Sequence, residues 1–271
     1  MPEIAKRVLT ALIAAPVFVG VTWLGGWVFV AVTVAIILII QLEMIQIVEK
    51  QNVKIQKPFA LLMGSAVFLM GLAPEIAWIF FLFLILLVMV TDMFFSGPDS
   101  WREMMFLTAV AVLIPALFSG LLMMRFLGDD YTGFVLTLTL LLMVWTNDVF
   151  AYFGGRLMGR NQLAPIISPK KTVEGFIWGF LGCFVALAVC IYFIPGYPLA
   201  WPLAIPFAVI VGVMGPLGDL AESKLKRASA VKDSSGLMPG HGGFYDRFDA
   251  VLFAAPASLI YFKLLIYFSM F

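Results

Sequence analysis

The sequence predicts an all-α protein that is embedded in a membrane and crosses it several times. Composition is the first reason: 63% of the 271 residues are hydrophobic and 12% are charged, whereas a soluble domain carries about 25% charged residues. The second is a series of apolar runs, each near the roughly 20 residues that a helix needs to span a bilayer. The third is the placement of lysine and arginine, which gather in alternate loops. Together these features predict a polytopic integral membrane protein.

About nine transmembrane helices are expected, with turn residues such as Gly25-Gly26 and Pro74 between them. The third apolar run is short, and the pair around Pro74 could form a re-entrant hairpin. The first run follows Lys6 and Arg7 and superficially resembles a signal peptide, but another apolar run comes directly after it, which favours an uncleaved span. The expected spans are residues 8–24, 26–47, 58–73, 75–93, 104–127, 131–152, 173–195, 198–221 and 247–270.

The basic residues predict the side of the membrane on which each loop lies. With the N-terminus inside and the C-terminus outside, all of the 17 lysines and arginines except Arg125 and Lys263 fall on the cytoplasmic side, as the positive-inside rule requires. Those two could extend their side chains to the opposite surface. The net charge of +1 gives no reason to expect nucleic-acid binding.

Polar signatures are concentrated in the second half of the chain. We therefore divide it into an N-terminal transmembrane scaffold, residues 1–130, and a transmembrane catalytic region with cytoplasmic polar loops, residues 131–271. Three groups of residues in the catalytic region could carry chemistry.

The first group lies at the end of the eighth expected span. Asp219, Glu222, Ser223 and Lys226 are spaced i, i+3, i+4 and i+7, so a continuing helix would place them on one face. An acid at the end of an apolar span is a functional candidate. Alternatively, Asp219 could be an interfacial carboxylate that pairs with Lys226 or Arg227. The glycines that precede this group, Gly212, Gly215 and Gly218, would allow another backbone to approach closely.

The second group is HGGFYDRFD, residues 241–249. The backbone amides of its glycine pair could bind phosphate oxygens, and His241 could be structural or catalytic. Asp246 and Asp249 are three residues apart and so share a face of the opening ninth helix, where capping is an alternative role for one of them. Asp219 and Asp246 could together hold Mg²⁺, which prefers carboxylate oxygens.

The third group comprises WTNDVFAYFGGRLMGR, residues 145–160, and SPKKTVEG, residues 168–175. Asp148 lies at the end of an apolar span, which is a costly place for a carboxylate without a role. The glycine–arginine pairs and the two lysines could form a cradle for an anion. The alternative is a positively charged cytoplasmic loop followed by a capped helix start. Gly175 and Gly179 have the GxxxG spacing that permits close helix packing.

Carboxylates and cations thus converge on one cytoplasmic edge of the membrane. Clustered lysine and arginine suit a polyphosphate, the acids suit its metal ion, and apolar walls suit a lipid. This combination indicates phosphoryl or nucleotidyl transfer to a lipid head group.

The segment from Ser223 to Asp249 reads SKLKRASAVKDSSGLMPGHGGFYDRFD. It closely resembles the signature of the CDP-diacylglycerol synthase (phosphatidate cytidylyltransferase) family, with Met238 as a mild departure where a Leu, Ile or Phe is usual. The third group is similar to the same family, so the resemblance covers roughly residues 145–250. It implies that CTP and phosphatidic acid give CDP-diacylglycerol and pyrophosphate in a Mg²⁺-dependent homodimer, with a second cation that could lie beside the Mg²⁺. It also implies a bacterial inner (cytoplasmic) membrane location with the active site facing the cytoplasm.

We assign roles from the residues and the resemblance together. Asp219 and Asp246 are expected to hold the metal and to act in catalysis with Lys226 and Asp148, although Asp148 could instead organise the basic loop. The expected substrate-binding residues are Ser168, Lys170, Lys171, Ser223, Arg227, Lys232, Asp233, His241, Gly242, Gly243, Arg247 and Asp249.

Two other functions compete with this one. Another CTP- or lipid-phosphate-handling transferase, such as a polyprenol kinase, would use a similar set of charges. An ion-coupled transporter would place its acids near the middle of the bilayer and show repeated halves, whereas the acids here lie toward one face and the two halves differ in polarity.

Overall fold

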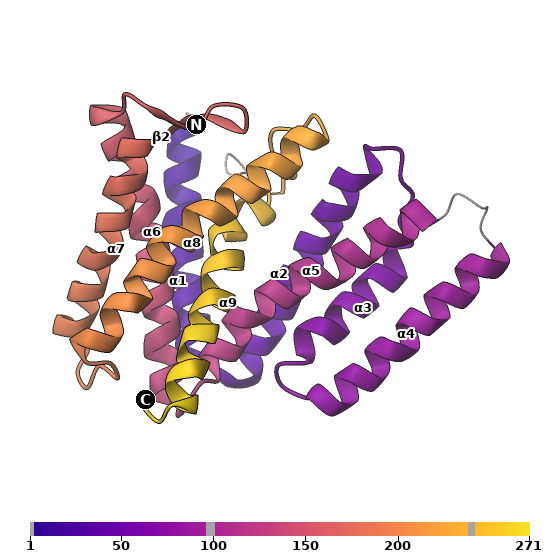
Figure 1. The fold of residues 1–271 in the computed structure, drawn as a ribbon, viewed down its shortest axis with the longest axis horizontal. Coiled ribbons are helices and arrows are strands. Elements are labelled where there is room, and N and C mark those ends of the chain that lie inside the picture. Colours follow the sequence, from indigo (N-terminus) through magenta and orange to yellow (C-terminus); the bar gives the residue numbers. More distant parts are fainter. Residues whose placement is uncertain (1–2, 96–100, 238–241) are drawn as a thin grey trace.

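The computed structural model describes residues 3–95, 101–237 and 242–271, and within them the chain is helical apart from one small hairpin (Figure 1). The all-α prediction is confirmed. The two strands, β1 (Gln162–Ala164) and β2 (Ser168–Thr172), pair antiparallel where the sequence predicted only a loop. The helices are α1 (Glu3–Leu24), α2 (Gly26–Glu49), α3 (Lys57–Leu69), α4 (Pro74–Phe95), α5 (Trp101–Arg125), α6 (Asp130–Met158), α7 (Val173–Phe193), α8 (Trp201–Ala228) and α9 (Tyr245–Tyr267).

Six helices in the described ranges are long and apolar enough to cross a membrane: α2, α5, α6, α7, α8 and α9. The polytopic character is therefore confirmed. The 13 residues of α3 span only about 20 Å at 1.5 Å per residue, short of the roughly 30 Å hydrocarbon core. The N-terminus and β2 lie at one end of the molecule and the C-terminus at the other (Figure 1), as an odd number of crossings requires. Nine crossings remain a prediction.

Close backbone contacts bring the helices of the second half together. On α7, Gly175, Gly179 and Gly182 face α6, and a Cβ added at Gly179 would lie 2.9 Å from the carbonyl oxygen of Asn147. The helix-packing role predicted from the GxxxG spacing is confirmed. On α8, Gly212 faces α7, while Gly215 and Gly218 face the start of α9. These contacts draw α6, α7, α8 and α9 together below the polar loops.

An aromatic cluster connects the start of α9 to the first half of the chain. The ring of Phe248 on α9 makes edge contacts with Phe18 on α1 and Phe118 on α5, each at a centroid distance of 5.4 Å. Such contacts add about 0.5–1.5 kcal/mol each beyond the area that they bury. The N-terminal helices thus support the helix on which Asp246 and Asp249 lie, while the functional division at residue 130 stays a prediction.

Arg125 departs from its predicted behaviour. It was expected to extend toward the opposite membrane surface, but its side chain is fully buried. Its Nε donates to the Thr22 carbonyl oxygen at 2.7 Å, and its guanidinium pairs with Asp130 at 2.8 Å. The turn after α1 closes over it, and so Arg125 joins the α1–α2 turn to the α5–α6 turn because a buried charge needs partners.

Replacing Gly25 with alanine should destabilise the protein by about 3 kcal/mol or more. Gly25 has a φ of +59°, and a Cβ there would overlap the buried Arg125 guanidinium. Gly26→Ala is the matched control, since Gly26 also has a positive φ, +49°, but nothing lies within 4 Å of its added Cβ. Thermal unfolding of both variants in detergent tests this, and equal losses of stability would contradict it.

Candidate active site

The polar face predicted at the end of α8 is confirmed. The helix continues to Ala228, past the expected end of the span. Along it, the Ser223 hydroxyl donates to Asp219 at 3.4 Å, and the Lys226 Nζ lies 2.9 Å from Glu222 Oε1. Glu222 and Lys226 are buried, so each charge depends on its partners.

Three carboxylates from two helices form an acidic cluster, Asp219 and Glu222 on α8 and Asp249 on α9. One oxygen from each lies within 4.8 Å of the others. The close approach of the helices explains this, because Gly218 leaves room for the Asp249 backbone. Carboxylates this close repel each other unless a cation or a proton intervenes. Their oxygens fit Mg²⁺, which is held by carboxylates together with substrate phosphates.

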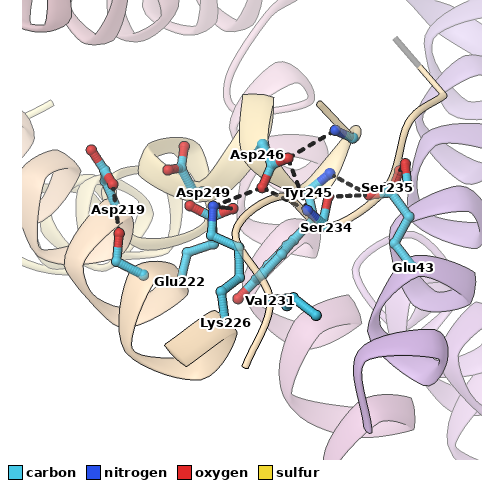
Figure 2. A network of polar contacts seen from close by, with 12 residues as sticks. Glu43, Asp219, Glu222, Lys226, Val231, Ser234, Ser235, Tyr245, Asp246 and Asp249 are labelled. Atoms are coloured by element: carbon cyan, nitrogen blue, oxygen red, sulfur yellow. Dashed lines mark hydrogen bonds and ion pairs between the residues drawn. The ribbon is translucent and has the colours of Figure 1, made fainter. Parts of the chain in front are cut away.

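Asp246 lies next to this cluster but is occupied by other partners. It accepts hydrogen bonds from the backbone amides of Gly243 at 2.8 Å and Ser234 at 3.1 Å, and it pairs with Lys226 at 2.9 Å. Figure 2 shows Lys226 between Asp246 and Glu222. The Gly243 amide belongs to the residue before the N-cap, Phe244, so a capping role for Asp246 on α9 remains a prediction. A metal ion shared by Asp219 and Asp246 remains a prediction.

A cavity of about 620 Å³ lies between α6, the β1–β2 hairpin, α7 and α8. It brings together residues from the first and third groups of the sequence, and Lys171 from the hairpin forms an ion pair with Asp219. The alternative in which Asp219 pairs with Lys226 or Arg227 is therefore not what the structure shows. The charged residues that line the cavity are Asp148, Arg156, Lys170, Lys171 and Asp219.

The hairpin is anchored by the start of α7. The Glu174 carboxylate accepts hydrogen bonds from the amides of Arg160 at 3.0 Å and Asn161 at 3.2 Å. The Thr172 hydroxyl caps α7 by accepting from the Gly175 amide at 3.1 Å. The capped helix start, one of the two predicted roles of this segment, is thus confirmed. It is compatible with the other role, a cradle for an anion, because the capped segment carries Lys170 and Lys171, which line the cavity.

The other predicted substrate residues are more dispersed. Arg227, Lys232, Asp233 and Arg247 are exposed around the loop between α8 and α9, and the Arg227 guanidinium donates to the Val231 carbonyl oxygen at 3.2 Å. Ser168 begins β2. In the 241–249 group, Gly242 has the positive φ expected, +82°, Gly243 is buried, and His241 lies outside the described residues.

Two acids in this region were missed as site residues. Glu222 was placed on the polar face of α8 but received no role, although it belongs to the acidic cluster. Glu43 lies in α2, within the half that was treated as scaffold, and it contacts the loop before α9. A lone carboxylate in an apolar span is itself a signal, and on that ground Glu43 could have been singled out.

Replacing Gly218 with alanine should lower stability by about 1–3 kcal/mol, because the added Cβ would overlap the Asp249 carbonyl oxygen and separate α8 from α9. Because this separation would also spread the acidic cluster, activity should fall as well. Gly215→Ala is the matched control: its Cβ would lie 3.8 Å from that of Ala250, an ordinary contact, and the higher helix propensity of alanine could add up to about 1 kcal/mol. Thermal unfolding and activity should separate the two, and similar behaviour would contradict the prediction.

The chain matches the model described as "Cytidylyltransferase family" over residues 5–265. The chain belongs to the cytidylyltransferase family. Similar proteins named phosphatidate cytidylyltransferase include that of Bacillus subtilis (strain 168), 33% identical with 98% of this chain and 100% of the relative covered. Those of Staphylococcus haemolyticus (strain JCSC1435) and Staphylococcus aureus (strain COL) are each 32% identical, with 92% of this chain and 95% of the relative covered. The resemblance first seen in residues 145–250 therefore extends over nearly the whole chain.

Proposed function

We propose that this cytidylyltransferase transfers the cytidylyl group of CTP to phosphatidic acid, giving CDP-diacylglycerol and pyrophosphate for phospholipid biosynthesis. The full-length similarity to phosphatidate cytidylyltransferases carries the proposal. The cavity supports it, because cations for phosphates lie beside carboxylates in a chain with long apolar helices.

The reaction forms one bond and breaks one. A phosphate oxygen of phosphatidic acid bonds to the α-phosphorus of CTP, and the bond from that phosphorus to the bridging oxygen breaks, so that pyrophosphate leaves with the electron pair. Phosphatidic acid is already anionic, so a general base is not required. The main task of the protein is to position two polyanions and offset their charge. Lys170, Lys171 and Arg156 are placed to do so from the cavity wall.

Asp219, Glu222 and Asp249 would hold Mg²⁺ in this proposal, and Asp246, which accepts from the Gly243 amide, would lie next to them. A bound Mg²⁺ would supply positive charge to the phosphate oxygens. Lys171 forms an ion pair with Asp219, a carboxylate that would also bind the metal. Lys171 is therefore placed to move from Asp219 to a substrate phosphate when the site is filled.

CTP labelled at either the α- or the γ-phosphate tests the proposed function directly. With phosphatidic acid as the acceptor, the α-label should enter the lipid and the γ-label should appear in pyrophosphate. In a parallel assay with a polyprenol as the acceptor, transfer of the γ-label to that lipid, with no α-label in phosphatidic acid products, would identify a lipid kinase and refute the proposal.

The setting in the membrane is part of the proposal. The relatives named above are bacterial, which supports a location in the bacterial cytoplasmic membrane. The β1–β2 hairpin and the C-terminal end of α8 lie at the same end of the molecule as the N-terminus (Figure 1). An N-in, C-out orientation would therefore place the cavity at the cytoplasmic face, where CTP is available. A homodimer is also part of the proposal, on the basis of the family resemblance.

A further inference from the structure

Glu43 on α2 is a buried carboxylate that belongs neither to the acidic cluster nor to the lining of the cavity. Glu43 is 1% exposed, and a buried charge is costly unless it is paired or hydrogen-bonded. In the described part of the chain, its partners are four donors, none of them a cation. They are the hydroxyls of Ser234 at 3.0 Å and Ser235 at 2.5 Å, and the backbone amides of Phe244 at 3.0 Å and Tyr245 at 2.8 Å.

These donors come from two places along the connection between α8 and α9. Ser234 and Ser235 lie in its first half, whereas Phe244 and Tyr245 lie where α9 starts. Amides at a helix N-terminus carry partial positive charge, which stabilises an anion there. One side chain from the N-terminal half of the protein therefore joins Ser234 and Ser235 to the start of α9, across more than 190 residues of sequence.

The contacts continue from Glu43 into the acidic cluster (Figure 2). Ser234 donates its hydroxyl to Glu43 and its amide to Asp246. Asp246 then pairs with Lys226, and Lys226 pairs with Glu222 of the cluster. Gly243 lies between the two acids, where a Cβ would overlap the Ser234 hydroxyl. The position of Asp246 therefore depends on Glu43, through Ser234 and the tightly packed Gly243.

We infer that Glu43 is a positioning residue for the transfer reaction: its carboxylate fixes Ser234, Ser235 and the start of α9, and thereby places Asp246 and Lys226 beside the acidic cluster. The inference rests on the proposed function. Glu43 itself is buried, and among the described residues none of its hydrogen-bond partners lines the cavity. It acts through Ser234 and the start of α9.

Glu43→Gln is the decisive variant because it keeps the shape and removes one acceptor. Oε1 accepts from Ser235 and Phe244, and Oε2 accepts from Ser234 and Tyr245. A serine hydroxyl can reverse and accept from the glutamine NH₂ group, but a backbone amide cannot. In either orientation glutamine therefore opposes an N–H at the start of α9. We expect kcat/KM for CTP to fall by up to about 100-fold, the cost of a small misplacement of reacting groups.

Limited trypsin digestion of the full-length protein in detergent gives a readout that does not depend on activity. In Glu43→Gln, cleavage after the exposed Lys232 should become faster, while cleavage after the exposed Lys54, between α2 and α3, should keep its wild-type rate. Gln41→Leu is the matched control. Gln41 is buried on the same helix and donates to the Ala60 carbonyl oxygen at 3.0 Å, so its loss should leave cleavage after Lys232 and kcat/KM unchanged.

Wild-type kcat/KM in Glu43→Gln would overturn the inference. Faster cleavage at both lysines, with a matching loss of thermal stability, would also overturn it, since that pattern indicates a general structural role. If Glu43→Gln does not fold, Ser234→Ala/Ser235→Ala removes two of the four donors and should show the same local cleavage with a smaller loss of activity. Failure of the proposed function would appear separately, as wild-type protein that does not transfer the α-label of CTP to phosphatidic acid.

Discussion

Asp219→Asn should reduce kcat/KM for CTP by at least about 100-fold. Asp219 belongs to the acidic cluster, lines the cavity and pairs with Lys171. A metal ion contributes several kcal/mol of charge stabilisation, and each 1.36 kcal/mol changes the rate tenfold. Asparagine removes one negative charge from the set that would hold Mg²⁺. The Mg²⁺ concentration for half-maximal activity should therefore rise as the rate falls, which a titration with purified protein measures.

Glu49→Gln is the control for this variant. Glu49 is an acid at the end of α2, where it pairs with Lys57 at 3.2 Å, outside the cavity, and its replacement should change neither the rate nor the Mg²⁺ requirement. Asp249→Asn should raise the Mg²⁺ requirement as Asp219→Asn does, because the two carboxylates share the cluster. Near-normal turnover of Asp219→Asn across the whole titration would contradict the metal assignment.

Lys226→Met should destabilise the protein by about 3–5 kcal/mol. The ammonium group lies 2.9 Å from both Glu222 and Asp246 and is largely buried. Removing it leaves two carboxylates close together without the cation between them, and each must then be protonated or moved to water. The loss of stability is measured by heating the protein in detergent and recording the fraction that stays monodisperse at each temperature.

Lys224→Met on the same helix is the matched control, because Lys224 is exposed, and it should stay within about 0.5 kcal/mol of wild type. Adding Glu222→Gln to Lys226→Met should recover part of the stability, since it removes one of the two charges left without a cation. Equal stability of the two single methionine variants would show that Lys226 is not the buried link between α8 and α9.

Regular features of the fold could be predicted because their causes are local. Each long helix arises from an apolar run of sufficient length. The polar face of α8 follows from residue spacing, and the structure extends that helix to Ala228. The β1–β2 hairpin was missed because strands of three and five residues leave little periodicity to detect. The burial of Arg125 was also missed, because it depends on the end of α1, more than 100 residues away in the sequence.

Contacts between distant segments account for the main differences at the site. The ion pair between Lys171 and Asp219 joins β2 to α8. Asp249 meets Asp219 and Glu222 because Gly218 allows α8 and α9 to approach. Spacing along the chain placed Asp246 and Asp249 on one helix face, but it could not show which of them would reach the cluster.

By itself, the sequence determined that this protein is a helical membrane protein with charged loops gathered on one side, and its motifs indicated the cytidylyltransferase family. These properties follow from composition, from the length of the apolar runs and from local spacing. Only the tertiary structure decided that Glu222 and Asp249 join Asp219, that Lys171 pairs with Asp219, and that Glu43 holds the start of α9. The physical reason is that the packing distance between helices, at glycines such as Gly218, decides which charged side chains meet. That distance cannot be inferred from the spacing of residues along one helix.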